Sequence, residues 1–164
     1  MNCNVRFYDA KRAELFGKKL TLTDKLIFAR SRPLVHVEFQ FSERYAHISF
    51  SATMRDGLDG CRFKAIDYTV NPQRWATLVL PLTDEQEDKA YLKAKQIEKY
   101  PYDLFGLLSF ISDLDVIKPD KYKYWCSEAV QELINAGFES TILFPEHTTP
   151  TGMFFDLSYW MGII

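Results

Sequence analysis

Hydrophobic and polar positions alternate most regularly just after Pro33. In residues 34–41 the apolar side chains alternate with mostly polar ones, among them His36, Glu38 and Gln40. A repeat of two is typical of a strand with one buried and one solvated face. Residues 46–52 alternate in the same way, and a turn is expected at 42–45. We therefore predict an antiparallel hairpin in which Phe41 pairs with Ala46.

Three helices are predicted downstream of this hairpin. Thr83 and Gln86 have the spacing of a capping box, which favours a helix over 83–99. The apolar segment 102–110 predicts a short helix, for which Asp103 is the expected cap. The third helix begins at Cys126 and is expected to end at Gly137, because glycine is typical of the residue after a helix.

The remaining segments are less regular. Two more strands are predicted at 61–67 and 75–80. The first thirty residues are ambiguous, with a strand at 4–9, a helix at 9–16 and either a helix or a strand at 23–30. The last segment, 143–164, has prolines that indicate a loop, followed by several aromatic residues. Together these elements predict an α+β fold, with a small antiparallel sheet or half-barrel packed against helices.

Size and charge restrict the class of protein. A chain of 164 residues with 47% hydrophobic residues is expected to form one domain over 1–164. The net charge of −2 gives no electrostatic reason to expect binding to nucleic acid or to an anionic membrane. No apolar run approaches the roughly 20 residues of a membrane span. Because the N-terminal residues lack the pattern of a secretory signal, a cytoplasmic location is expected.

The cysteines and histidines are too scattered for a metal site or a disulfide framework. Three cysteines without C-x-x-C spacing are typical of reduced thiols, and the histidines form no H-x-x-x-H pair. We therefore expect no metal and no organic cofactor, and we assign no role to the last histidine. The cysteines are Cys3, Cys61 and Cys126, and the histidines are His36, His47 and His147.

Cys126 is the strongest candidate for chemistry. The first turn of a helix has unpaired N–H groups and positive partial charge, which favour a thiolate and can later bind an oxyanion. His36 on the predicted strand is the candidate base. Glu38 lies two residues along the same face, about 6–7 Å away, and can orient the imidazole. The sequence thus predicts a nucleophile, a base and an orienting carboxylate.

Two alternatives to Glu38 remain open as the third residue. In the predicted hairpin, His47 lies four positions from His36, roughly 13 Å by strand rise, unless the turn slips. Ser49 lies opposite Glu38. The substrate pocket or oxyanion site is assigned to residues near the cysteine, although the aromatic ones could equally belong to the core. These pocket residues are Ser127, Tyr102, Tyr124 and Trp125.

Several motifs in their order along the chain resemble a known family. They are H-V-E at 36–38, R-D-G at 55–57, R-F-K-A-I-D at 62–67, Y-D-L-F-G-L-L at 102–108 and W-C-S-E at 125–128. This order resembles the permuted papain-like hydrolases of the NlpC type, which include bacterial amidase-like proteins and many phage-encoded ones. The similarity covers about 33–138, and 149–157 is similar to a tail that such proteins often have.

The resemblance implies a circularly permuted papain-like fold, in which the histidine strand precedes the cysteine helix. It implies Cys126 as the nucleophile and His36 as the base of a cysteine hydrolase that forms a thioester acyl-enzyme. The expected partner is then a peptide, acyl or isopeptide substrate.

Two other functions fit the same fold. Lecithin-retinol acyltransferase-like proteins are similar in order, but an asparagine precedes their cysteine, where this chain has Trp125. A non-catalytic phage protein that binds a host factor is the other alternative. A host-protein partner or a homo-oligomer is compatible with that alternative, and a phage product would act in the host cytoplasm.

Overall fold

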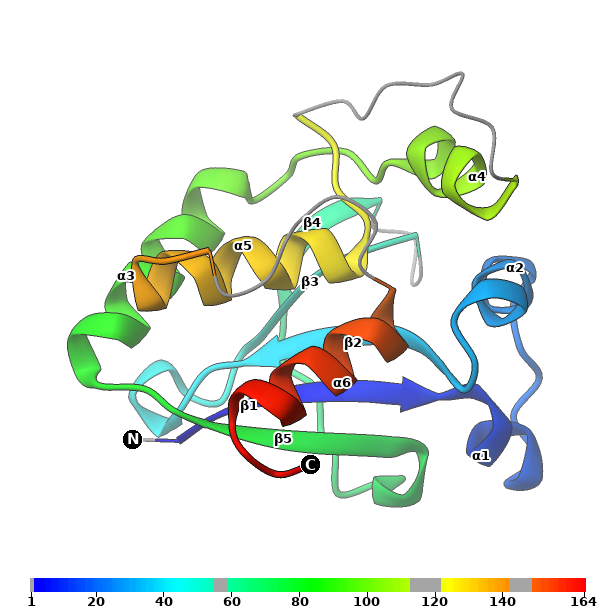
Figure 1. Cartoon of the computed structure of the whole chain (residues 1–164), viewed down its shortest axis with the longest axis horizontal. Coiled ribbons are helices and arrows are strands. Elements are labelled where there is room, and N and C mark those ends of the chain that lie inside the picture. Colours follow the sequence, from blue (N-terminus) through cyan, green and yellow to red (C-terminus); the bar gives the residue numbers. More distant parts are fainter. Residues whose placement is uncertain (1, 55–58, 113–121, 142–148) are drawn as a thin grey trace.

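A five-stranded antiparallel sheet organises the protein, which is an α+β structure (Figure 1). The computed structural model describes residues 2–54, 59–112, 122–141 and 149–164, so the predicted R-D-G motif at 55–57 and His147 lie outside the described residues. In spatial order the strands are β4 (Gly60–Lys64), β3 (Ser49–Thr53), β2 (Leu34–Gln40), β1 (Asn2–Asp9) and β5 (Trp75–Pro81).

The N-terminal strand β1 lies inside the sheet, between β2 and β5. The ambiguous segment 4–9 is therefore part of a strand that pairs on both sides. Tyr8 lies opposite His36 on β2 and opposite Trp75 on β5. This register brings residues from three distant parts of the sequence into one row across the sheet.

The hairpin between β2 and β3 forms, but the predicted register is wrong by two residues. Phe39 pairs with Phe50, and Gln40 pairs with Ser49. The turn is longer than expected because it contains the 3-10 helix η1 (Glu43–Tyr45), after which Ala46 and His47 both have φ of 53°.

Three helices cover one face of the sheet (Figure 1). They are α3 (Asp84–Ile97), α5 (Cys126–Phe138) and α6 (Pro150–Trp160). Apolar side chains from these helices pack with strand residues into the main core. The largest fully buried apolar side chains of this core are Phe7, Phe39, Phe41, Phe50, Leu80, Leu133, Ile134, Met153 and Leu157.

The start of α3 was predicted correctly and the end of α5 was not. Thr83 and Gln86 form the predicted capping box of α3. The predicted end of α5 at Gly137 is wrong, because the helix continues to Phe138 and Glu139 takes the left-handed conformation instead.

The loop predicted to extend through Pro150 is wrong at its end, because Pro150 is already the first residue of helix α6. The hydroxyl of Thr149 accepts a hydrogen bond from the Gly152 N–H at 2.9 Å, and Pro150 occupies the first turn, where proline is well tolerated.

The other short elements are α1 (Ala10–Leu15), α2 (Leu22–Arg30), η2 (Pro72–Arg74) and α4 (Leu104–Ser112). Residues 23–30 are thus helical. The Asp103 carboxylate accepts a hydrogen bond from the Gly106 N–H at 2.8 Å, which confirms it as the cap of α4. A second apolar cluster joins these elements to the sheet and to the start of α5: Tyr8, Ala10, Ala13, Ile27, Val35, Leu107 and Trp125.

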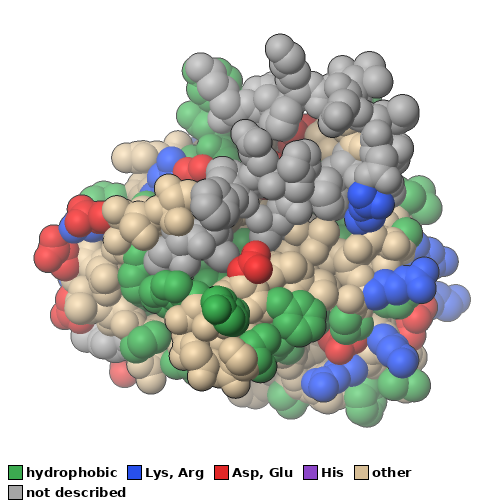
Figure 2. Space-filling view, viewed as in Figure 1, with side chains coloured by type: hydrophobic (Ala, Val, Ile, Leu, Met, Phe, Trp, Pro, Cys, Tyr) green, Lys and Arg blue, Asp and Glu red, His purple; other side chains and the backbone are tan. Residues whose placement is uncertain are grey.

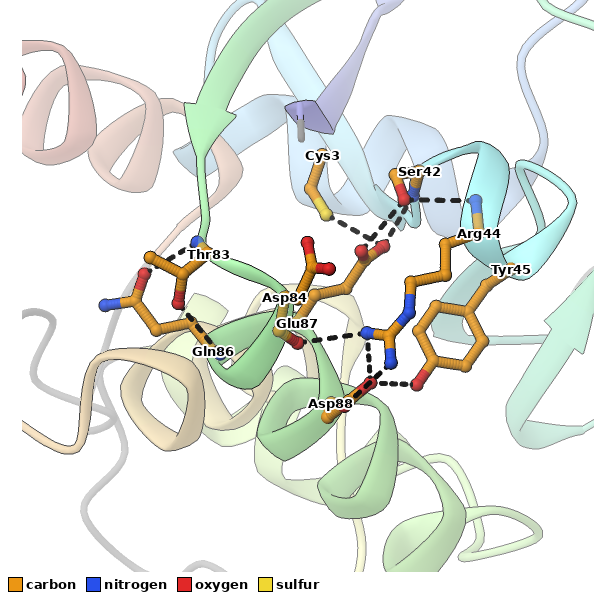
Figure 3. A network of polar contacts seen from close by, with 9 residues as sticks. All are labelled: Cys3, Ser42, Arg44, Tyr45, Thr83, Asp84, Gln86, Glu87 and Asp88. Atoms are coloured by element: carbon orange, nitrogen blue, oxygen red, sulfur yellow. Dashed lines mark hydrogen bonds and ion pairs between the residues drawn. The ribbon is translucent and has the colours of Figure 1, made fainter.

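A buried carboxylate ties α3 to the sheet (Figure 3). Glu87 accepts hydrogen bonds from the N–H and hydroxyl of Ser42, at 2.7 and 2.8 Å, and from the Cys3 thiol at 3.3 Å. The next residue of α3, Asp88, binds Arg44 and the Tyr45 hydroxyl. These contacts hold the β2–β3 turn against α3.

Within the described part of the chain, the helices are all too short or too polar to traverse a bilayer.

Candidate active site

The polar side of β2 is buried, whereas the sequence predicted a solvated face. His36 is 5% exposed and Glu38 is 2% exposed. Both side chains line a cavity of about 740 Å³. The alternating pattern was therefore correct, but the polar side chains of β2 line a cavity and are largely shielded from bulk water.

His36 and Glu38 form a buried hydrogen-bonded pair. His36 Nε2 lies 2.9 Å from Glu38 Oε1. On β4, Arg62 donates to both oxygens of the same carboxylate, from Nη2 to Oε1 at 3.2 Å and from Nη1 to Oε2 at 3.4 Å. Arg62 is itself only 9% exposed and lines the same cavity. The carboxylate is thus held from two sides.

The environment keeps Glu38 ionised. Burial by itself raises the pKa of a carboxyl group, but the hydrogen bond and charge of His36, followed by the charge of Arg62, lower the pKa of Glu38 to about 2. A permanent negative charge beside the imidazole stabilises its protonated form.

Sequence reasoning did not identify Arg62. The residue belongs to β4 and pairs with Ser51, and β3 separates its strand from the strand of Glu38. No local spacing indicates a contact across an intervening strand. The one signal available was a basic residue between the apolar Cys61 and Phe63.

Cys126 is the first residue of α5 and is buried. It lines a small, mostly apolar hollow of about 10 Å³, together with Trp125 and Ser127. A space of this size accommodates about one water molecule. The thiol therefore adjoins a space in which a small reacting group can be placed.

The hollow at Cys126 and the cavity at His36 are neighbours. Ile27 and Tyr102 line both of them. Trp125, which directly precedes Cys126, packs in the same cluster as Tyr8, and Tyr8 lies opposite His36 in the sheet. The start of α5 and the middle of β2 thus meet at one end of the second apolar cluster.

Glu128 supports the start of α5. Its carboxylate accepts a hydrogen bond from the Trp125 N–H at 3.1 Å. Burial raises the pKa of Glu128 to about 8, and the nearby charges of Asp103 and Glu132 act in the same direction. The group is therefore largely protonated at neutral pH, which limits the negative charge two residues from Cys126.

The other two thiols have environments that suppress reactivity. Burial and then Glu128 raise the pKa of Cys61 to about 12. Burial, followed by the hydrogen bond and charge of Glu87, raises the pKa of Cys3 far above its ordinary value (Figure 3). Both groups remain protonated at neutral pH, and a thiol is a much weaker nucleophile than a thiolate.

The two alternatives to Glu38 lie in different environments. His47 is exposed in the β2–β3 turn, so the slip of the hairpin does not bring it to His36. Ser49 is buried, but its hydroxyl is hydrogen-bonded to the Tyr68 hydroxyl at 2.8 Å.

The predicted pocket residues divide into two groups. Trp125 and Ser127 line the small hollow, and Tyr102 lines both spaces. Tyr124 is not among the lining residues of either space, and its ring stacks on Tyr100 with 6.0 Å between centroids. Tyr124 therefore has a packing role, which was the other prediction made for these aromatic residues.

Among residues 2–54, 59–112, 122–141 and 149–164, no group of three His, Cys, Asp or Glu side chains is placed to hold a metal ion.

Neither a protein-family model nor a curated protein matches the chain.

Proposed function

We propose that this protein is a cysteine hydrolase that cleaves an amide, ester or thioester bond, with Cys126 as nucleophile and His36 as base. One observation carries the proposal. The buried His36–Glu38 pair, which Arg62 holds in place, lines a cavity. Two residues of that cavity also line the hollow at Cys126. A structural histidine does not need an ionised carboxylate and a second buried cation at the border of a cavity.

The proposed first step forms a thioester. With the Nε2–H of His36 donated to Glu38, the base is Nδ1, which takes the proton of the Cys126 thiol. The sulfur attacks the carbonyl carbon, and N–H groups in the first turn of α5 stabilise the oxyanion. The intermediate collapses when His36 returns the proton to the leaving amine, alcohol or thiol.

The second step releases the acid. His36 removes a proton from water, the hydroxide attacks the thioester, and Cys126 leaves and is reprotonated. Glu38 stays ionised throughout and stabilises the imidazolium that forms in each step, as in other triads. Arg62 is a positioning residue, because it contacts Glu38 and not the reacting atoms.

The first experiment compares the three thiols. Iodoacetamide labelling is followed at each cysteine by mass spectrometry between pH 5.5 and 9. We expect Cys126 to react fastest, with a rate that rises well below pH 8.5, since the other two thiols are protonated across this range. His36→Asn is expected to move the Cys126 profile to higher pH. Equally slow labelling of all three thiols in the wild type contradicts the proposal.

The second experiment measures turnover with a panel of model thioesters, esters and amides. Cys126→Ala is expected to abolish hydrolysis, whereas Cys61→Ala, a matched change of another buried thiol, is expected to retain it. Adding an amine acceptor separates the acyltransferase alternative, which predicts an acylated amine in preference to the free acid. Hydrolysis that survives in Cys126→Ala excludes the proposed nucleophile.

A further inference from the structure

The cavity lined by His36 and Glu38 has a second chemical feature. A pair of cationic side chains lies on its side away from β4. Lys18 and Arg74 both line this cavity. Arg74 Nη2 donates to the backbone oxygen of Phe16 at 3.1 Å, so its guanidinium lies beside the segment that leads to Lys18. Arg74 thus contacts the chain two residues before Lys18, and both cations line the same cavity.

Neither cation is neutralised within the described part of the chain. No acidic group there pairs with Lys18, and Arg74 Nε is buried without a hydrogen-bond partner. The acidic residues of the same lining outside the Glu38 site are engaged in their own turns. Asp24 accepts from the Thr21 N–H and hydroxyl, and Asp67 accepts from Thr69. A cation pair of this kind favours an anion between its members.

The surrounding surface has the same sign. Residues 10–32, which include α1 and α2, contain seven Lys and Arg residues against two acidic residues, although the whole chain has a net charge of −2. Figure 2 shows basic side chains gathered on this side of the molecule. An anionic molecule is therefore attracted toward the end of the cavity that Lys18 and Arg74 line.

The sheet register sets the distance from this end to the catalytic pair. Tyr8 lies directly between His36 and Trp75, and Trp75 follows Arg74. Two strand spacings of about 4.8 Å place the backbones of His36 and Trp75 roughly 10 Å apart. The rings of Tyr8 and Trp75, in edge contact at 5.1 Å, line the cavity between them.

We infer that the substrate carries an anionic group, a carboxylate or a phosphate, which binds Lys18 and Arg74 two strands away from His36, roughly 10 Å from the catalytic base. The segment between the two ends lies over the aromatic rings of Tyr8 and Trp75 and is apolar. This inference rests on the proposed hydrolase function and narrows its substrate class to amphiphilic acyl compounds with a charged end.

Matched substrates test the inference by turnover. One series of thioesters ends in a carboxylate, a phosphate monoester or a neutral primary amide, each with a spacer of about 10 Å, and a second series has half that spacer. For the long series we expect kcat/KM to be at least about tenfold higher with either anion than with the amide, because a hydrogen bond to a charged group is worth about that factor. The comparison of the two anions identifies which one is preferred.

Variants locate the effect. Lys18→Gln is expected to remove most of the preference for the anion by lowering kcat/KM for the charged substrates. Lys19→Gln is the control, because Lys19 is an exposed neighbour outside the cavity lining. Arg74→Lys retains the charge and is expected to keep more of the preference than Arg74→Gln. Equal kcat/KM for charged and neutral substrates overturns the inference but leaves the hydrolase proposal intact.

Binding separates this inference from a failure of the chemistry. Phenyl phosphate is titrated calorimetrically into Cys126→Ala, which cannot turn over. Binding that is lost in Cys126→Ala/Lys18→Gln and kept in Cys126→Ala/Lys19→Gln supports the anion site even if no hydrolysis is found. Binding that both double variants retain equally places the anion elsewhere and overturns the inference.

Discussion

Lowering the pH should remove a specific part of the stability of this fold, because Glu38 is ionised and buried. The pKa of this group falls from its ordinary value of 4.5 to about 2 in the folded protein. At about 1.4 kcal/mol for each pH unit, that difference corresponds to about 3 kcal/mol of folding free energy. Because the folded pKa lies below the unfolded one, the contribution is complete above about pH 4.5 and disappears as the pH falls through about 2.

The assay is urea unfolding between pH 7 and pH 2.5, with wild type compared with Glu38→Gln. The glutamine keeps the shape and an acceptor for His36 but cannot be ionised. At pH 7 we expect the variant to be less stable, since it leaves Arg62 buried opposite a neutral group. The difference in unfolding free energy should shrink as the pH falls below about 4.5, while all other carboxyl groups titrate in both proteins alike.

A third protein, Arg62→Gln, tests the cause of the low pKa. Removing the cation is expected to raise the pKa of Glu38, so the contribution of Glu38 should be smaller in this protein, and its loss below about pH 4.5 should be complete at a higher pH than in wild type. A difference between wild type and Glu38→Gln that stays constant from pH 7 to pH 2.5 would refute the reasoning. It would mean that the ionised form of Glu38 is not preferentially stabilised by folding.

Two further predictions concern helix starts. Glu128→Gln keeps an acceptor for the Trp125 N–H but removes a carboxyl group whose pKa is raised to about 8. As the pH rises from about 4.5 to 8, the unfolding free energy of wild type should therefore fall relative to that of the variant by roughly 1 kcal/mol per pH unit. Parallel plots of unfolding free energy against pH for the two proteins would contradict this prediction. Thr83→Ala removes the hydroxyl that accepts a hydrogen bond from the Gln86 N–H at 3.2 Å, and it should lower the free energy of unfolding in urea by about 1 kcal/mol. Thr83→Ser is the control, because serine keeps the hydroxyl. An alanine variant as stable as wild type would show that this cap is dispensable.

Local signals in the sequence predicted local structure well. Thr83 and Gln86 lie three residues apart and bond to each other's backbone, so their interaction is encoded within one turn. Asp103 caps α4 in the same way. The helix at Pro150 carried an equally local signal, a Thr–Pro pair that is typical of a helix start, but the proline was interpreted as part of a loop.

Long-range pairing was the part that the sequence did not reveal. The hairpin register was wrong because it depends on the conformation of Ala46 and His47, two non-glycine residues in a left-handed conformation that sequence alone seldom indicates. The pairing of β1 with β5 joins residues 67 to 79 positions apart.

The candidate site shows the same division. His36 and Glu38 could be predicted to interact because a strand repeat of two places them on one face. Their burial could not, because it depends on residues from several other segments that enclose the cavity. Arg62 reaches Glu38 across an intervening strand, and a basic residue between two apolar ones does not by itself indicate such a contact.

The position of β1 connects the catalytic proposal with the anion site. This strand lies between β2, which carries His36, and β5, which begins at Trp75 directly after Arg74. Its Tyr8 lies opposite His36 on one side and opposite Trp75 on the other. Tyr8 also packs in the cluster that holds Trp125 at the start of α5. A substrate that spans His36 and Arg74 must therefore cross β1 over Tyr8. Tyr8→Ala should then weaken turnover of long anionic substrates more than of short neutral ones, whereas a purely structural role of Tyr8 would lower both equally.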